Sequence, residues 1–172
     1  MGEFWDTIRN QFTGAAKAPR QAPLQTVPWI DLKRYLGDWF EIATIPQSFQ
    51  RECTATRASY SLREDGDIDV VNTCRVGGLN GPVKQIRGRA RVVDHQTNAK
   101  LKVSFFRPFW GDYWIIEIGN NYEYAVVSGP TRQYLWILSR TPQMDGIVYD
   151  GILERLRAQG FDTSLLRKTI QP

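Results

Sequence analysis

Few residues in this chain of 172 have the chemistry that catalysis or metal binding requires. The only histidine, His95, lies in the turn-like stretch DHQTN, and Glu41 and Glu117 fall inside apolar runs, where we expect outward or hydrogen-bonded carboxylates. An enzyme needs a positioned acid, base or nucleophile. The sequence has no Ser-His pairing, no glycine-rich phosphate loop and neither CxxC nor HxxxH spacing. These patterns predict no enzyme, no metal site and no cofactor.

Two cysteines, Cys53 and Cys74, flank a predicted hairpin in which TATRASYSL and IDVVNTC are joined by the turn REDGD. If the hairpin pivots at Asp65 and Gly66, both sulfur atoms lie towards its open end, where a disulfide is geometrically feasible. A disulfide would indicate an oxidising compartment. The alternative is a pair of reduced, partly buried thiols.

The composition is that of an ordinary globular protein, with 42% hydrophobic and 23% charged residues. The net charge is +4, but basic and acidic residues are interspersed, so we do not expect nucleic-acid binding. The most apolar segments, YWIIEIG and YLWILS, are too short to cross a bilayer. The start, MGEFWDTIRNQF, lacks the basic residues and continuous apolar segment of a secretory signal.

The pattern divides the chain into an N-terminal arm, residues 1–28, and one domain, residues 29–172. The second half of the arm is a linker rich in proline and alanine. The first half predicts a short amphipathic helix, because four apolar residues fall at helical spacing: Phe4, Trp5, Ile8 and Phe12. We expect this stripe to dock on the body of the protein, with a partner chain or a membrane surface as alternatives.

Eight short alternating segments follow between Ile30 and about Arg140, with turn residues between them. They are DWFEIATIP, ATRASYSL, DIDVVNTC, VKQIRGRARVV, AKLKVSFF, DYWIIEI, YEYAVVSG and QYLWILSR. Such a meander predicts an all-β fold, an eight-stranded antiparallel up-and-down β-barrel. Closure hides the strand edges, and the interior of such a barrel accommodates one small ligand.

After Arg140 the hydrophobic period changes to that of a helix. Asp145 is the expected N-cap, and the helix should end at Gly160. Its apolar stripe predicts packing against the outside of the barrel: Val148, Tyr149, Ile152, Leu153 and Leu156. The final stretch FDTSLLRKTI is expected as one more short strand or an extended tail.

The stretch YLGDWFEIATIP places an indole at the start of the first strand. We expect Trp39 to plug one end of the barrel, with Gly37 letting the preceding turn meet the strand closely. A guanidinium stacked on the ring would cover it, and Arg140 at the end of the last strand is the candidate. Such a cation–π contact contributes on the order of 1 kcal/mol.

Three motifs occur in the order and separation seen in lipocalins, and the chain resembles in particular the bacterial outer-membrane lipocalins and apolipoprotein D. They are YLGDWFEIA with Gly37 and Trp39, NYEYAVVSGP from Asn121, and LWILSRTP with Arg140; ATRASYSL and LKVSFFRPFWGDYW support them. The resemblance covers roughly residues 27–169. It implies a calyx that binds hydrophobic molecules such as fatty acids and lysophospholipids, in the bacterial envelope.

The sequence departs from the bacterial lipocalins in one respect, and the family also offers an alternative function. The bacterial group typically carries a lipid-modified cysteine near its start, and no cysteine precedes Cys53 here. Membrane anchoring is therefore open, whereas a periplasmic or outer-membrane-associated location agrees with the cysteine pair. A few lipocalins isomerise or de-epoxidise their ligands, so an enzyme acting on a lipid or isoprenoid is the alternative to a binding protein.

Strand alternation, together with the resemblance, predicts which side chains face the ligand. Arg140 at the plugged end turns Trp136 inward, and Tyr60 presents a polar tip that a ligand can use. Lys100 and Lys102 should face water, which turns three side chains inward: Leu101, Val103 and Phe105.

Four further positions depend more on the resemblance. Asn72 corresponds to a position that lines the calyx in relatives, with a solvent-facing amide as the alternative. Trp110 and Tyr113 fall in RPFWGDY, which by similarity lies at the open mouth and would hold a head group. Arg87 alternates outward in QIRGRARVV, but a bulge at Gly88 would turn it inward as a site for a carboxylate or phosphate.

Overall fold

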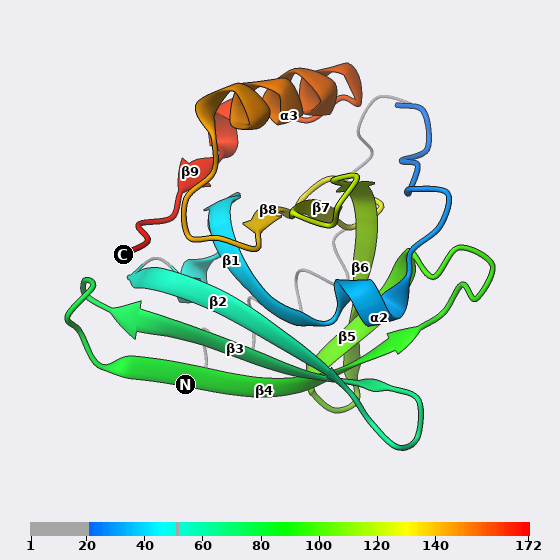
Figure 1. Ribbon diagram of the computed structural model, residues 1–172, viewed down its shortest axis with the longest axis horizontal. Coiled ribbons are helices and arrows are strands. Elements are labelled where there is room, and N and C mark those ends of the chain that lie inside the picture. The colour runs from blue at the N-terminus through cyan, green and yellow to red at the C-terminus, as the bar shows by residue number, and fades with distance from the viewer. Residues whose placement is uncertain (1–20, 51) are drawn as a thin grey trace.

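The computed structural model describes residues 21–50 and 52–172. The predicted helix containing Phe4, Trp5, Ile8 and Phe12 lies outside these residues. Eight antiparallel strands close into a barrel, which confirms the predicted fold (Figure 1). They are β1 (Gly37–Thr44), β2 (Cys53–Leu62), β3 (Ile68–Val76), β4 (Val83–Val92), β5 (Lys100–Phe106), β6 (Phe109–Ile118), β7 (Tyr124–Ser128) and β8 (Leu135–Ser139). Each strand pairs with the next along the chain, and β1 pairs with both β8 and β2.

The chain also forms helical elements and a short ninth strand. They are α2 (Leu32–Tyr35), the 3-10 turns η1 (Ser48–Gln50) and η2 (Thr163–Leu165), α3 (Gly146–Ala158) and β9 (Arg167–Lys168). The short strand predicted near the C-terminus is β9, which pairs with β1 through Ala43 and Thr44.

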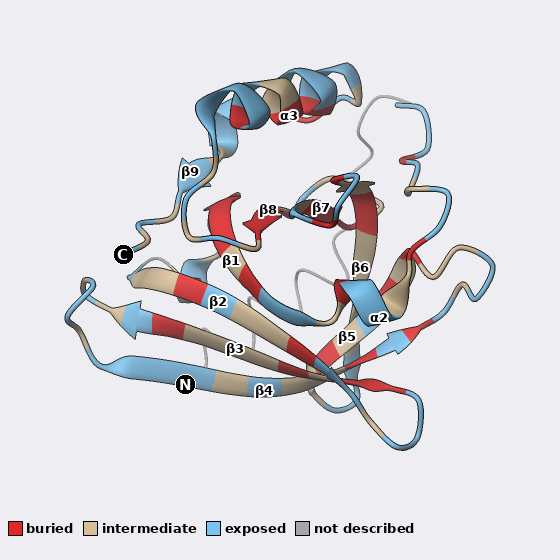
Figure 2. Cartoon of the chain, viewed as in Figure 1, coloured by how far each residue is buried: buried red, intermediate tan, exposed pale blue. Residues whose placement is uncertain are grey.

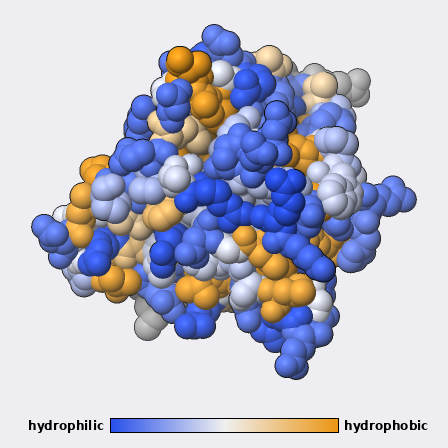
Figure 3. Space-filling view, viewed as in Figure 1, coloured by the Kyte–Doolittle hydropathy of each residue, from blue (hydrophilic) through white to orange (hydrophobic). Residues whose placement is uncertain are grey.

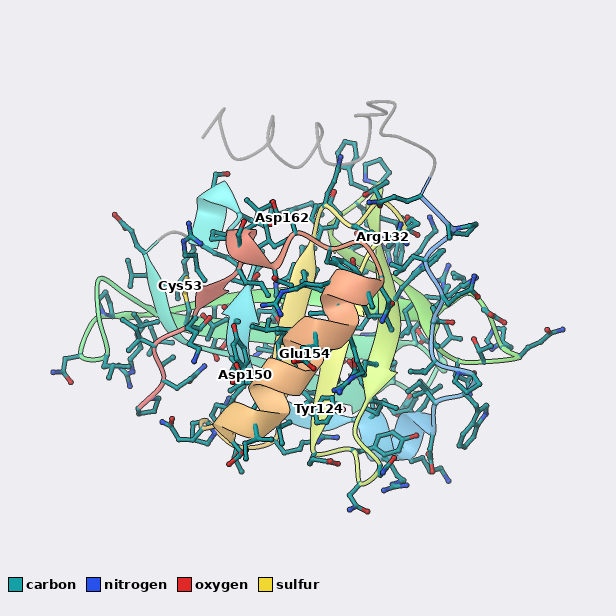
Figure 4. All side chains as sticks on the ribbon, turned by 90° about the horizontal axis from the view of Figure 1, so that it is seen from above. Cys53, Tyr124, Arg132, Asp150, Glu154 and Asp162 are labelled. Atoms are coloured by element: carbon teal, nitrogen blue, oxygen red, sulfur yellow. A yellow bond between two sulfur atoms is a disulfide. The ribbon has the colours of Figure 1, made fainter. Side chains whose placement is uncertain are left out.

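The C-terminal helix forms where the sequence predicts it. Asp145 accepts hydrogen bonds from the backbone N–H groups of Ile147 and Val148, so it is the N-cap. Seen from above, α3 lies diagonally across the strands, with Asp150 and Glu154 on the helix (Figure 4). Three residues of the predicted stripe, Tyr149, Ile152 and Leu156, are buried on the barrel and Leu153 is partly buried, whereas Val148 is 39% exposed.

The buried side chains form two clusters, which Figure 2 shows as red segments on the strands and on the barrel side of α3. One cluster fills the closed part of the barrel and includes Trp39, Val70 and Ile115. The other lies between the barrel wall and α3 and includes Val126 and Ile137. The face in Figure 3 is largely hydrophilic, with hydrophobic atoms in separate patches.

The predicted plug is present at the end of the barrel where β1 begins. Trp39 is fully buried and donates a hydrogen bond from Nε1 to the carbonyl oxygen of Tyr35 at 2.8 Å. The guanidinium of Arg140 lies 3.7 Å from the centre of the indole ring. Gly37 has φ +94°, and a Cβ at this position would lie 3.4 Å from Arg140 Nη1, so both the turn and the close approach favour glycine.

Residues 21–30 lie against the barrel without regular secondary structure. The backbone N–H groups of Val27 and Ile30 donate to the carbonyl oxygens of Ile115 and Thr97, and Leu24 is buried. No helix within residues 21–50 and 52–172 has the length and apolar composition needed to cross a membrane.

Candidate ligand-binding site

The barrel encloses a cavity of about 260 Å³ on the far side of the inner core from the plug. It extends from Tyr60 and Tyr113 to the strand ends marked by Cys53 and Cys74. Most of its wall is apolar: Ala58, Val70, Ile86, Val103, Phe105, Phe106, Phe109, Trp136 and Leu138. A cavity with one closed end and an apolar wall can exclude water from a hydrocarbon chain.

Three tyrosine hydroxyls meet at the floor of the cavity. Tyr113 Oη lies 2.7 Å from Tyr35 Oη and 3.0 Å from Tyr60 Oη. Burial raises the pKa of Tyr60 to about 12, so the group is a neutral phenol. The three hydroxyl groups are hydrogen-bonded to one another, and the raised pKa keeps the phenol of Tyr60 uncharged. The floor of the cavity is therefore polar but carries no charge.

The structure places Tyr60, Val103, Phe105 and Trp136 on the cavity wall, where alternation predicts them. Asn72 also faces the cavity, and its Oδ1 is buried without a hydrogen-bond partner among the described residues. These placements leave their role in ligand binding as a proposal.

Of the two aromatic residues expected at the mouth, Tyr113 does not lie there, whereas Trp110 lies beside the β5–β6 turn at the open end of the barrel but points outward. The connection between β5 and β6 occupies only residues 107–108, so Tyr113 lies well inside β6 and contributes to the floor. Phe109, Gly111 and Tyr113 face the cavity, and alternation therefore turns Trp110 outward. The Arg91 guanidinium lies 5.3 Å from the centre of the Trp110 ring.

Leu101 points inward as predicted but does not line the cavity. It pairs with Tyr113 and is 2% exposed, so it belongs to the packed core beside the floor. Alternation predicts the face of a strand that a side chain occupies, and it does not predict the height at which the core ends and the cavity begins.

The inward orientation considered for Arg87 is also wrong. The pairing of β3 with β4 continues without a shift from Ile68 and Ala90 to Arg75 and Val83, so Gly88 is not a bulge. Ile86 therefore faces the cavity and Arg87 is exposed outside. Gly88 has a packing role instead, because a Cβ there would lie 2.6 Å from Phe105 Cδ1.

Glu41 lines the cavity, although the sequence predicts that its carboxylate points outward or is hydrogen-bonded within the wall. It is 5% exposed, and its Oε1 accepts a 2.5 Å hydrogen bond from Thr169 Oγ1. Burial raises the pKa of Glu41 to about 7, although the hydrogen bond from Thr169 opposes the shift. The signal was present in the sequence, since Trp39 faces inward and Glu41 follows it by two.

Glu117, the other carboxylate considered, faces the outside. Its Oε1 lies 2.5 Å from Arg155 Nη2 on α3 and accepts a hydrogen bond from Tyr124 Oη at 2.8 Å. It thus joins the helix to the barrel wall and does not reach the cavity.

Cys53 and Cys74 form the predicted disulfide, with their Cα atoms 5.4 Å apart. Both residues line the cavity near its open end. Among the described residues, no group of three or more His, Cys, Asp or Glu side chains is arranged to hold a metal ion.

Comparison with known proteins gives a consistent result. The lipocalin-like domain family matches residues 30–171. Outer membrane lipoprotein Blc of Escherichia coli K12 is 43% identical over 83% of this chain and 80% of its own, and mouse apolipoprotein D is 34% identical over 82% and 77%. The structure of insecticyanin from the tobacco hornworm aligns with a TM-score of 0.69 and 20% identity, covering 91% of this chain and 87% of that one.

A closed eight-stranded antiparallel barrel with a plugged end, an internal cavity and an outer C-terminal helix defines a calyx-type protein. The chain belongs to the lipocalin family.

Proposed function

We propose that this protein binds and carries one single-chain lipid, a fatty acid or a lysophospholipid, in its calyx. The observation that carries the proposal is the apolar cavity of about 260 Å³, which is closed at one end by the tyrosine floor and the Trp39 plug. Burying a hydrocarbon chain there gives about 0.8 kcal/mol per CH₂ group. The ligand-contacting residues that we propose are Tyr60, Asn72, Val103, Phe105 and Trp136.

The cellular location that we propose is the bacterial envelope. Relatives with 42–43% identity are named outer membrane lipoproteins, and the Cys53–Cys74 disulfide is typical of an oxidising compartment. Contact of residues 1–20 with a membrane surface is part of this proposal and concerns residues outside the described structure.

A displacement titration tests the binding function. An environment-sensitive fluorescent fatty acid is bound first, and unlabelled fatty acid or lysophospholipid is then added. We expect stoichiometric displacement and no chemical change in the recovered lipid. Trp136→Ala should weaken binding about tenfold, because an aromatic wall residue is lost.

Trp114→Ala is the matched control. Trp114 lies outside the cavity and packs against the cluster between the barrel wall and α3. The centre of its ring is 4.5 Å from Lys100 Nζ. Equal effects of the two substitutions, or failure of every lipid to displace the probe, would contradict binding in the calyx.

A further inference from the structure

The barrel wall opens between β4 and β5. These strands pair only from Arg89 to Val92 on β4, opposite Leu101 to Ser104 on β5. The other half of β4, residues 83–88, pairs with β3 alone within the described chain. An outer hollow of about 280 Å³ lies at this separation, beside the turn that joins β5 to β6.

Four arginines line this hollow, and two of them, Arg63 and Arg89, are paired with aspartates, as is the neighbouring Arg91. Three aspartates of the β2–β3 turn region, Asp65, Asp67 and Asp69, accept from three arginines: Arg63 lies 2.6 Å from Asp69, Arg89 lies 2.5 Å from Asp67, and Arg91 lies 3.0 Å from Asp67. The ion pairs hold these side chains in place and leave no net charge among the six.

Arg87 and Arg107 also line the hollow, and neither has a carboxylate partner among the described residues. The nearest polar partner of Arg87 is neutral: the Gln85 side-chain oxygen, in the amide orientation that satisfies its hydrogen bonds, accepts from Arg87 Nε at 3.1 Å. The hollow therefore carries two positive charges that the surrounding aspartates do not balance.

A buried hydroxyl group also lines this hollow. Ser104 lines the same hollow and is 6% exposed, and its Oγ has no hydrogen-bond partner within the described chain. Buried polar groups without partners are rare in folded proteins. An anion seated against the two arginines would supply an acceptor for this donor.

The outer hollow adjoins the calyx. Phe105 and Phe106 line both cavities, so these two side chains are the partition between them. A lipid whose chain lies against the inner face of Phe106 can leave the calyx beside the β5–β6 turn and place its polar end on the outer side.

We propose that Arg87 and Arg107 form an outer site for the phosphate group of a single-chain lipid whose hydrocarbon chain lies in the calyx. This proposal rests on the lipid-binding function above. A guanidinium group can donate two parallel hydrogen bonds to two oxygens of one phosphate, which increases the affinity and fixes the orientation of the phosphate. The same chemistry would bind a soluble phosphate, so the test must separate the two sources.

The experiment compares three probes by calorimetry: a lysophosphatidic acid, the monoacylglycerol with the same acyl chain, and glycerol phosphate. Each is titrated into the wild-type protein and the double variant Arg87→Gln/Arg107→Gln. We expect the variant to lose about tenfold or more in affinity for lysophosphatidic acid, with unchanged affinity for monoacylglycerol. The loss should shrink at high salt, because the site is exposed.

The control is Lys33→Gln/Arg157→Gln, which removes the same charge from exposed positions elsewhere. It should leave all three affinities unchanged. Equal losses for both lipids, a loss in the control as large as in the test variant, or no loss at all would overturn the proposal. Binding of glycerol phosphate as tight as that of lysophosphatidic acid would also overturn it, in favour of a soluble phosphate. If neither lipid binds the wild-type protein, the calyx function itself fails.

Discussion

The carboxyl group of Glu41 lies inside the barrel wall, 2.5 Å from the hydroxyl of Thr169 in the C-terminal tail. Gln171 of the same tail donates from Nε2 to the carbonyl oxygens of Glu41 and Thr56 at 2.8 and 2.9 Å. The tail therefore joins β1 and β2 at the side of the calyx, and it supplies the hydrogen bond that a buried carboxyl needs.

The raised pKa of Glu41 predicts that the protein loses stability as pH rises. The folded pKa is about 7 and the ordinary value is 4.5, so between these values the folded protein binds more protons than the unfolded chain. The contribution of Glu41 to the free energy of unfolding is complete below pH 4.5, decreases by about 3 kcal/mol between pH 4.5 and pH 7, and does not change further at higher pH.

Glu41→Gln should remove this fall, and chemical denaturation across pH 4 to 8 measures it. Glu154→Gln, at an exposed position on α3, is the control and should retain the wild-type profile. A Glu41→Gln profile that matches the wild type would show that Glu41 does not titrate in this range.

Removal of Arg140 should destabilise the closed end of the barrel. The guanidinium stacks on Trp39 and donates hydrogen bonds to the carbonyl oxygens of Leu36 and Asp38 at 3.0 and 2.9 Å. A shorter side chain cannot make these contacts. We expect Arg140→Ala to lower the free energy of unfolding by about 3 kcal/mol. Arg140→Lys should recover less than half of this, because an ammonium lacks the planar fork.

Urea denaturation at neutral pH measures both effects, with Arg157→Ala as an exposed control that should change stability by less than about 0.5 kcal/mol. Equal stability of Arg140→Lys and the wild type would mean that charge alone, without stacking and directional hydrogen bonds, accounts for the contribution.

The disulfide should stabilise the protein through the unfolded state. Cys53 and Cys74 are separated by 21 positions, and closing a loop of this length contributes about 3 kcal/mol in the chain-entropy treatment. The double variant Cys53→Ser/Cys74→Ser should lose this amount in urea denaturation. Addition of a reductant should lower the stability of the wild type and leave the variant unchanged; a reductant effect on the variant would point to another cause.

Asn72→Leu should stabilise the ligand-free protein. Asn72 Oδ1 is buried in the cavity wall without a partner among the described residues, and such an atom costs about 1–3 kcal/mol. Leucine has a similar shape and removes the polar group, so the melting temperature should rise. A fall in melting temperature would mean that the amide has a partner, such as water, in the empty calyx.

The sequence predicts the barrel well because each level of the pattern agrees. Alternation, turn residues and the change of period after Arg140 specify the strands and α3, and Trp39 and Arg140 fall at the two strand ends that closure brings together. The Cys53–Cys74 pairing follows in the same way from the register of one hairpin.

Details of the cavity depend on features that a period of two does not contain. The β5–β6 pairing shifts between Val103 and Phe106, and the short turn leaves Tyr113 well inside β6 and turns the side chain of Trp110 outward. The height of Leu101 along its strand depends on where the core ends. Glu41 is stabilised inside by Thr169, which is 128 positions away in the sequence and has no local signal.

The central claim is that the calyx holds a single-chain lipid. The most direct measurement is native mass spectrometry of the protein purified from the envelope of its own host, followed by denaturing extraction and identification of the released compound. The account predicts one fatty acid or lysophospholipid per protein chain, released on unfolding. A protein that carries no lipid and takes up none when incubated with both classes would contradict it.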